Sequence, residues 1–241
     1  MIGASGGQRS ASPLPFRALL FDVNETLLDL AALDPLFVAT FGDAAVRRDW
    51  FAESLRLAFV STLVGRASDF AAIGQAALRL SAERHGLPPS AVPVADLAAR
   101  MRALPPHPDV PDALARLRAA GFTLAALTNN PPAVLAAQLD HAGLAPLFDH
   151  ALSAADSGRL KPAPDPYRMA LARFALPAET VLFVAAHGWD IAGAAAAGLP
   201  TAFIARPGQD LDPLAPPPAF VTPDVAALAD ELLSRRAPEG G

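Results

Sequence analysis

The hydrophobic and polar positions of the chain follow two different rhythms. Residues 17–23 form a short apolar run, typical of a strand buried in a parallel sheet. From about residue 31 to residue 103, apolar positions recur every three or four residues, which predicts a series of helices. After a proline-rich segment at 104–111, the chain alternates between helical segments (110–120, 131–143, 164–175, 190–198 and 223–235) and strand-like runs (122–128, 148–153, 180–186 and 201–205).

This alternation predicts the fold class. Strands that alternate with helices imply βαβ crossovers and a parallel sheet, so we expect an α/β protein with a doubly wound, Rossmann-like core. The helical stretch after the first strand predicts an inserted domain. We assign residues 16–28 and 106–236 to the core, residues 29–105 to a helical cap, and residues 1–15 to a disordered tail.

Composition removes several classes of function. The formal net charge is −5 and no basic run is present, which argues against nucleic acid as a partner. No apolar segment reaches the roughly 18 residues of a transmembrane helix, so we expect no membrane partner and a soluble, cytoplasmic protein. The absence of cysteine excludes disulfides, thiolate catalysis and cysteine-ligated metal.

Polar side chains follow the predicted strands at the edge where parallel sheets bind their ligands. Asp22 follows the first strand, Thr128 and Asn129 end the next along the chain, and His187 and Asp190 follow strand 180–186. Ligands of open parallel sheets bind beyond the carboxyl ends of the strands, near the point where the strand order reverses. We therefore expect these side chains to share one site.

Three residue types are rare enough to be informative. The basic residues are 18 arginines and one lysine, Lys161; the only tyrosine is Tyr167; the asparagines are Asn24, Asn129 and Asn130. The composition of this chain favours Ala, Arg and Pro, and it contains very little Lys, Tyr and Asn. Where these types remain, we infer that a similar residue cannot replace them. The alternative for Lys161 is an ordinary surface lysine, and Asn129 could simply cap the helix after it.

Four segments together resemble a known family. "FDVNETL", "LTNNPP", "LKP" and "VAAHGWDIAGA" are similar, in this order, to the four motifs of the haloacid dehalogenase superfamily, over about residues 17–206. The helical insert resembles that superfamily's cap domain. Trp189, Asp190 and Tyr167, six residues after the lysine of the third motif, resemble the type II (L-2-haloacid) dehalogenase branch.

The resemblance implies a mechanism and a partner. Asp22 would attack the α-carbon of a small anionic substrate and form an aspartyl ester, and Lys161 would stabilise negative charge. Water would then cleave the ester, with either Asp190 or His187 as the base. The family also favours a homodimer.

The substrate-binding residues are likewise carried over from the resemblance. Thr128 and Asn129 would bind the substrate carboxylate, and Thr26 would orient the nucleophile. The remaining residues of this group are Asn24, Tyr167 and Trp189.

Asn24 separates this chain from the superfamily's phosphatases, which resemble it but carry Asp-x-Asp in the first motif. Their second aspartate is a general acid, whose loss typically costs about 10² to 10⁴-fold in rate. Their fourth motif supplies a Gly-Asp pair where this chain has Ala185 and Ala186. Only Asp22 and Asp190 remain as carboxylate ligands for a metal, so we predict neither metal nor cofactor. A halide leaving group needs no proton and suits what is left.

The chain also departs from the type II pattern. The branch usually has an aromatic residue at Asn24, glycine at Glu25, serine at Ala185 and asparagine at His187. Phe51 stands where its halide-receiving cap arginine is expected, and Arg47, Arg48 and Arg56 are the nearby candidates to replace that arginine.

Two rival functions remain open from the sequence: a magnesium-dependent phosphatase that tolerates Asn24, and a catalytically silent binding protein on the same fold. The remaining histidines lie outside the motifs and are predicted to be surface or packing residues; they are His85, His107, His141 and His150.

Overall fold

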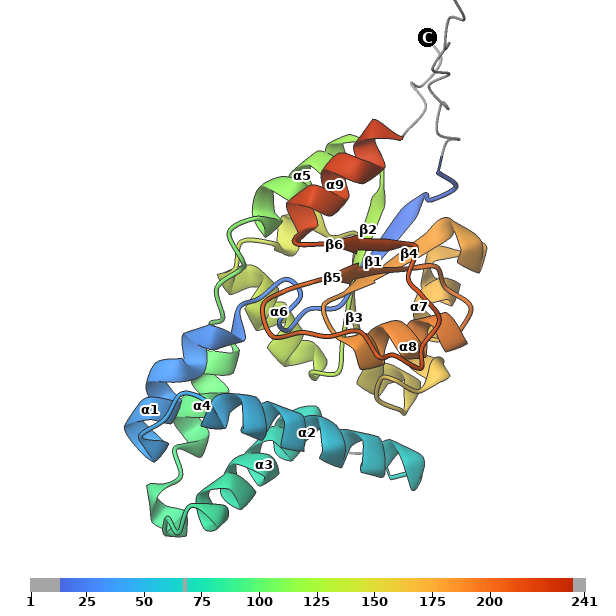
Figure 1. The fold of residues 1–241 in the computed structure, drawn as a ribbon. Helices are drawn as coiled ribbons and strands as arrows, with labels where there is room; N and C mark the ends of the chain where they lie inside the picture. The colour runs from blue at the N-terminus through green and yellow to red at the C-terminus, as the bar shows by residue number, and fades with distance from the viewer. Residues whose placement is uncertain (1–13, 67–68, 236–241) are drawn as a thin grey trace, which may run out of the picture.

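The computed structural model describes residues 14–66 and 69–235. Within them, six parallel strands form one sheet in the order β3-β2-β1-β4-β5-β6 (Figure 1). The strands are β1 (Ala18–Phe21), β2 (Thr123–Thr128), β3 (His150–Ser153), β4 (Val181–Ala185), β5 (Thr201–Ile204) and β6 (Phe220–Thr222). The predicted α/β class with a doubly wound parallel sheet is confirmed. The predicted tail, residues 1–15, lies outside the described residues except for its last two.

Alternate side chains of the central strands enter two separate cores. Leu19 and Phe21 of β1 face α5 (Val110–Ala119), α6 (Pro132–His141) and α9 (Val225–Ser234). Ala18 and Leu20 face α7 (Pro164–Phe174) and α8 (Gly188–Ala196) on the opposite side. All four residues of β1 are fully buried, because a parallel sheet is covered on both faces. Such a strand reads as a continuous apolar run, which is why the sequence revealed it.

The edge strand β6 was missed by the sequence analysis. It has three residues, and Pro216–Pro218 and Pro223 stand on either side of it. A run this short carries no measurable period, and prolines usually indicate a loop. The strand forms only because β5 offers a free edge with which Phe220–Thr222 pair.

The helical insert lies at one end of the sheet. Its helices are α1 (Asp34–Phe41), α2 (Val46–Leu63), α3 (Phe70–Arg84) and α4 (Val94–Met101), and Figure 1 shows α2 between the sheet and α3. The chain leaves and returns side by side: the Asp29 amide donates to the Pro105 carbonyl at 2.9 Å, and the His107 amide to that of Leu27 at 2.9 Å. These crossings lie close to the predicted limits of residues 29–105, although the division into domains stays a prediction. Short 3₁₀ helices span Leu30–Leu33, Pro89–Ala91, Ala145–Leu147, Ala154–Ser157 and Ala178–Thr180.

The strand order reverses between β1 and β4, and this places the candidate site. The chain builds the sheet outward in one direction through β2 and β3, and in the other through β4, β5 and β6. The carboxyl ends of the central neighbours β1 and β4 deliver Asp22 and His187 to the same crevice. Helix α2 covers it, with the Phe51 ring 5.7 Å from that of His187. Among the described residues, no helix has the length and apolar character needed to span a membrane.

Candidate active site

Asp22 stands directly after β1 and is held on all sides. Its amide donates to the Val184 carbonyl of β4 at 2.9 Å, and its side chain is buried. The Thr26 hydroxyl donates to Oδ2 at 2.7 Å and itself accepts the Ala186 amide at 2.9 Å. Thr26 is fully buried and does not line the cavity next to Asp22, so its predicted role in orienting the nucleophile fits this contact and stays a prediction.

Lys161 lies between two carboxylates. Its Nζ donates to Asp22 Oδ1 at 2.7 Å, to Asp190 Oδ2 at 2.6 Å and to the Leu127 carbonyl at 2.9 Å, which uses all three of its protons. The residue is 1% exposed, so the surface-lysine alternative is wrong. Burial acts to lower the pKa of Lys161, but the charges of Asp190 and Asp22 raise it above its usual value.

Asn129 holds the backbone of Lys161. Its side-chain oxygen accepts the Lys161 amide at 2.8 Å, and its Nδ2 donates to the Lys161 carbonyl at 3.2 Å. Because both ends of its amide group engage one residue, Asn129 joins the end of β2 to the loop before α7. The predicted alternative of a cap on α6 has no support, because the N-cap of that helix is Pro131 with no side-chain cap bond.

Asp190 occupies the first turn of α8 and is closed off from the crevice. Lys161 binds its Oδ2, and the Tyr167 hydroxyl makes a short hydrogen bond to its Oδ1. Burial and the charge of Asp22 raise the pKa of Asp190, against the opposing effect of Lys161. Tyr167 is itself fully buried, and a Cβ at Gly193 would lie 2.6 Å from its hydroxyl, so only glycine fits there. Tyr167 therefore contacts Asp190 and does not line the cavity next to Asp22, and its predicted contact with the substrate stays a prediction.

His187 bridges Asp22 to a residue that the sequence analysis did not select. Its Nδ1 lies 3.3 Å from Asp22 Oδ2, and its Nε2 lies 2.9 Å from Oε2 of Glu25. Burial acts to lower the pKa of His187, but hydrogen bonds to Asp22 and Glu25, together with their charges, raise it to about 9. The imidazole is therefore protonated at neutral pH when Asp22 is free. Opposite effects act on Asp22: burial would raise its pKa, but Lys161 and His187 hold it well below its usual range.

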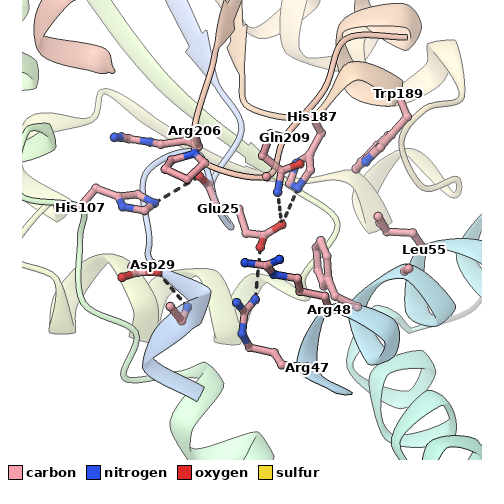
Figure 2. A pocket seen from close by; sticks show the side chains of 15 residues that line it. Glu25, Asp29, Arg47, Arg48, Leu55, His107, His187, Trp189, Arg206 and Gln209 are labelled. Carbon is pink, nitrogen blue, oxygen red and sulfur yellow. Dashed lines mark hydrogen bonds and ion pairs between the residues drawn. The ribbon is translucent and has the colours of Figure 1, made fainter. Parts of the chain in front are cut away.

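Two cavities meet at this site. The smaller, of about 20 Å³, adjoins Asp22, and its walls include Asn24, Thr128, Asn129 and Trp189. The larger, of about 540 Å³, lies between α2 and the loop after β5, and Figure 2 shows Glu25 at its centre. His187 and Trp189 line both.

The comparisons with known proteins agree with this geometry. A model of the haloacid dehalogenase-like hydrolases matches residues 16–198, more than half of the chain. The chain belongs to the haloacid dehalogenase-like hydrolase family. It is 28% identical over 221 residues to (S)-2-haloacid dehalogenase H-109 of Pseudomonas putida, covering 91% of this chain and 99% of that protein. It is 32% identical over 198 residues to (S)-2-haloacid dehalogenase 1 of Pseudomonas sp. (strain CBS-3), covering 80% of this chain and 86% of that protein.

A solved structure resembles this haloacid dehalogenase-like hydrolase over almost its whole length. It is the L-2-haloacid dehalogenase from Xanthobacter autotrophicus with chloropropionic acid covalently bound, with a TM-score of 0.85 and 26% identity. The match covers 90% of this chain and 98% of that one. The predicted resemblance to the family is thereby confirmed.

Lys161 bridges the two carboxylates that the sequence leaves as metal ligands in this haloacid dehalogenase-like hydrolase, Asp22 and Asp190. One oxygen of each carboxylate is therefore occupied by the ammonium, and independence from metal stays a prediction. In the described part of the chain, no group of three or more His, Asp or Glu side chains is arranged to hold a metal ion. The positive charge between the two carboxylates is therefore the ammonium group of Lys161.

The three candidate cap arginines separate in the structure. Arg47 is buried and pairs with Asp34 at 2.5 Å and with Glu25 at 3.4 Å. Arg48 lines the larger cavity. Arg56 pairs with Glu53 at 2.7 Å and lines neither cavity, so nothing in its position supports the predicted part in receiving halide. Phe51 lines both cavities, in contact with His187.

Other residues near the site were missed or misread. Gln138 of α6 donates to Asn24 Oδ1 at 3.1 Å and to the Met101 carbonyl at 2.8 Å, which ties the nucleophile loop to α4. His107, predicted to be a surface or packing residue, contacts the Glu25 carbonyl at 3.2 Å and lines the larger cavity. Glu25 has one signal in the sequence: it stands where the resembling branch has glycine.

Proposed function

We propose that this protein hydrolyses a 2-haloalkanoic acid through an aspartyl ester on Asp22, without a metal. The observation that carries the proposal is the position of Lys161, whose ammonium bridges Asp22 and Asp190 at 2.7 and 2.6 Å. The printed names of the relatives, (S)-2-haloacid dehalogenases, support the same substrate class.

In the first step, a carboxylate oxygen of Asp22 attacks the substrate's α-carbon. The carbon–halogen bond breaks, halide leaves, and an ester forms. Asn24 carries no titratable proton, and its Oδ1 is occupied by Gln138. Halide needs no proton to leave, so the loss of the acid found in phosphatases has no cost for this reaction.

Polar side chains of the smaller cavity can bind the substrate carboxylate. Thr128 Oγ1 accepts the Asn130 amide at 3.2 Å, which leaves its O–H proton for an anionic group in the smaller cavity. Asn129 and Trp189 also line this cavity. We assign Thr128 and Asn129 to the carboxylate and Trp189 to the alkyl group.

In the second step, water attacks the carbonyl carbon of the Asp22 ester. The bond from that carbon to the ester oxygen breaks, so that this oxygen leaves on the α-carbon as the hydroxyl of a 2-hydroxy acid and the water oxygen restores the Asp22 carboxylate. A base must take a proton from the water, and Asp190 and His187 are the two titratable candidates next to Asp22. A homodimer and a cytoplasmic location stay predictions.

The test is a parallel assay of halide release from 2-chloropropionate and phosphate release from p-nitrophenyl phosphate, each with and without chelator. We expect chelator-resistant halide release and, during turnover in ¹⁸O-labelled water, incorporation of the label into Asp22. Asp22→Asn is the control and should release no halide. Magnesium-dependent phosphate release would favour the phosphatase, and neither activity would favour the silent binding protein.

A further inference from the structure

Glu25 occupies a backbone position that does not suit it. Its φ is +61°, in the left-handed region that favours glycine. Such a conformation is strained for a residue with a side chain and persists where the surroundings impose it. The turn around it is set by hydrogen bonds from the Leu27 and Leu28 amides to the Val23 carbonyl, at 2.8 and 3.0 Å. A glutamate at this point therefore calls for a role of its side chain.

The side chain of Glu25 is anchored toward His187. Oε2 accepts from His187 Nε2 at 2.9 Å and from Gln209 Nε2 at 3.0 Å, and Oε1 faces Arg47 Nη1 at 3.4 Å (Figure 2). Burial acts to raise the pKa of Glu25, but the hydrogen bond and charge of His187 and the charge of Arg47 lower it, so the group is a carboxylate. An ionised acceptor on Nε2 leaves Nδ1 as the reactive nitrogen, and that nitrogen faces Asp22.

The rival base is not available to a water molecule. Both oxygens of Asp190 are occupied, one by Lys161 and the other by Tyr167, and the residue is fully buried. Asp190 is not among the residues that line the cavity at Asp22, whereas His187 is.

We infer that Glu25 is a positioning residue that makes His187 the base for hydrolysis of the Asp22 ester. The inference rests on the proposed function and goes beyond it, because it selects between the two bases and gives Glu25 a part in one half of the reaction only. Asp22, His187 and Glu25 then act as nucleophile, base and orienting carboxylate. The type II branch that the sequence resembles usually has glycine at the position of Glu25 and therefore lacks the orienting carboxylate.

The protons balance over the cycle. Before reaction, His187 is an imidazolium flanked by Asp22 and Glu25, with Lys161 and Arg47 as the next charges. Esterification removes the charge of Asp22, and His187 then releases its Nδ1 proton to solvent. Neutral Nδ1 takes a proton from the attacking water and gives it to the ester oxygen that departs on the α-carbon. The restored Asp22 carboxyl group passes its own proton back to His187. The sum is one haloacid and one water converted into hydroxy acid, halide and a proton.

The test separates the two halves of the reaction. Glu25→Gln is mixed with 2-chloropropionate in a single turnover, chloride and lactate are followed by rapid quench, and intact mass reports an adduct on Asp22. We expect chloride release at the parental rate, lactate formation slowed about 10²-fold, and accumulated adduct. Asp29→Asn is the matched control. Asp29 lines the same larger cavity without contacting His187, and its substitution removes one negative charge, as Glu25→Gln does. It should behave as the parent.

Glu25→Gly provides a second variant that suits the left-handed backbone and opens a space beside His187. Added formate should restore part of the lactate rate in Glu25→Gly and leave Asp29→Asn unchanged, which a purely structural role would not produce. If Glu25→Gln forms lactate at the parental rate, or if it loses chloride release and shows no adduct, the inference about Glu25 is overturned and the proposed function still stands. If the parent protein itself releases no chloride, the proposed function fails and the inference falls with it.

Discussion

The two sides of Asp22 are built in contrasting ways. On one side, the Lys161 flank (Lys161, Asp190 and Tyr167) is sealed from the larger cavity: every polar atom that faces Asp22 is paired, and no residue is more than 1% exposed. On the other, the His187 flank (His187, Glu25, Gln209 and Arg47) borders the cavity of about 540 Å³ and reaches helix α2. A sealed flank can hold charge in place, whereas an open one can exchange protons and water.

The contrast matters because the two proposed half-reactions have different needs. Halide displacement needs an ionised, correctly oriented carboxylate, which the Lys161 flank maintains. Ester hydrolysis needs water and a group that changes its protonation state, which the His187 flank provides. We therefore expect variants in the Lys161 flank to slow both steps and variants in the His187 flank to slow the second.

The largest effect is expected for Lys161→Arg. The wider, planar guanidinium cannot take the place of a compact ammonium that binds two carboxylates and the Leu127 carbonyl in a buried space. Chloride release and lactate formation should both fall by about 10² to 10³-fold. Arg159→Lys is the control, since Arg159 is an exposed residue of the same loop that pairs loosely with Asp165 at 4.0 Å. Near-parental turnover by Lys161→Arg would show that this flank needs charge but not shape.

The second prediction concerns the pH dependence of stability. The pKa of His187 is about 9 in the folded protein and 6.5 in the unfolded reference, so its stabilising contribution is complete below pH 6.5 and is lost as pH rises toward 9. The difference corresponds to about 3 kcal/mol. Urea unfolding at pH 6, 7.5 and 9 should show this loss in the parent and a smaller one in His187→Asn. Equal slopes in the two proteins would mean that His187 is not charged between Asp22 and Glu25.

The smallest effect is expected for Tyr167→Phe. The ring packs at right angles to that of Phe183, at 5.4 Å, and this contact survives the substitution. The lost hydroxyl leaves one oxygen of buried Asp190 unpaired, which should cost about 1–3 kcal/mol in the free energy of unfolding. Both half-reactions should slow together, by about tenfold, because Asp190 holds Lys161 in place. Accumulation of the ester in this variant would assign the second step to the sealed flank instead.

Much of this molecule was determined by its sequence alone. The apolar run of β1, the alternation of strands with helices and the insert after Asp22 are local patterns, and local patterns survive without knowledge of the fold. The rarity of Lys161 and Tyr167 pointed to the Lys161 flank. In a chain that otherwise uses arginine and almost no tyrosine, a single lysine and a single tyrosine indicate positions where a similar residue cannot replace them.

The tertiary structure alone decided the His187 flank. Glu25 and His187 are separated by 162 positions, and no periodicity connects them. The pKa of His187 depends on burial and on two carboxylates from another strand end, so the sequence suggested an ordinary imidazole where the fold makes a charged one. The choice among Arg47, Arg48 and Arg56 depended on how α2 is rotated against the core. Hydrophobic pattern is a property of neighbours in the chain, whereas charge and hydrogen bonding depend on neighbours in space, and only the folded chain brings those together.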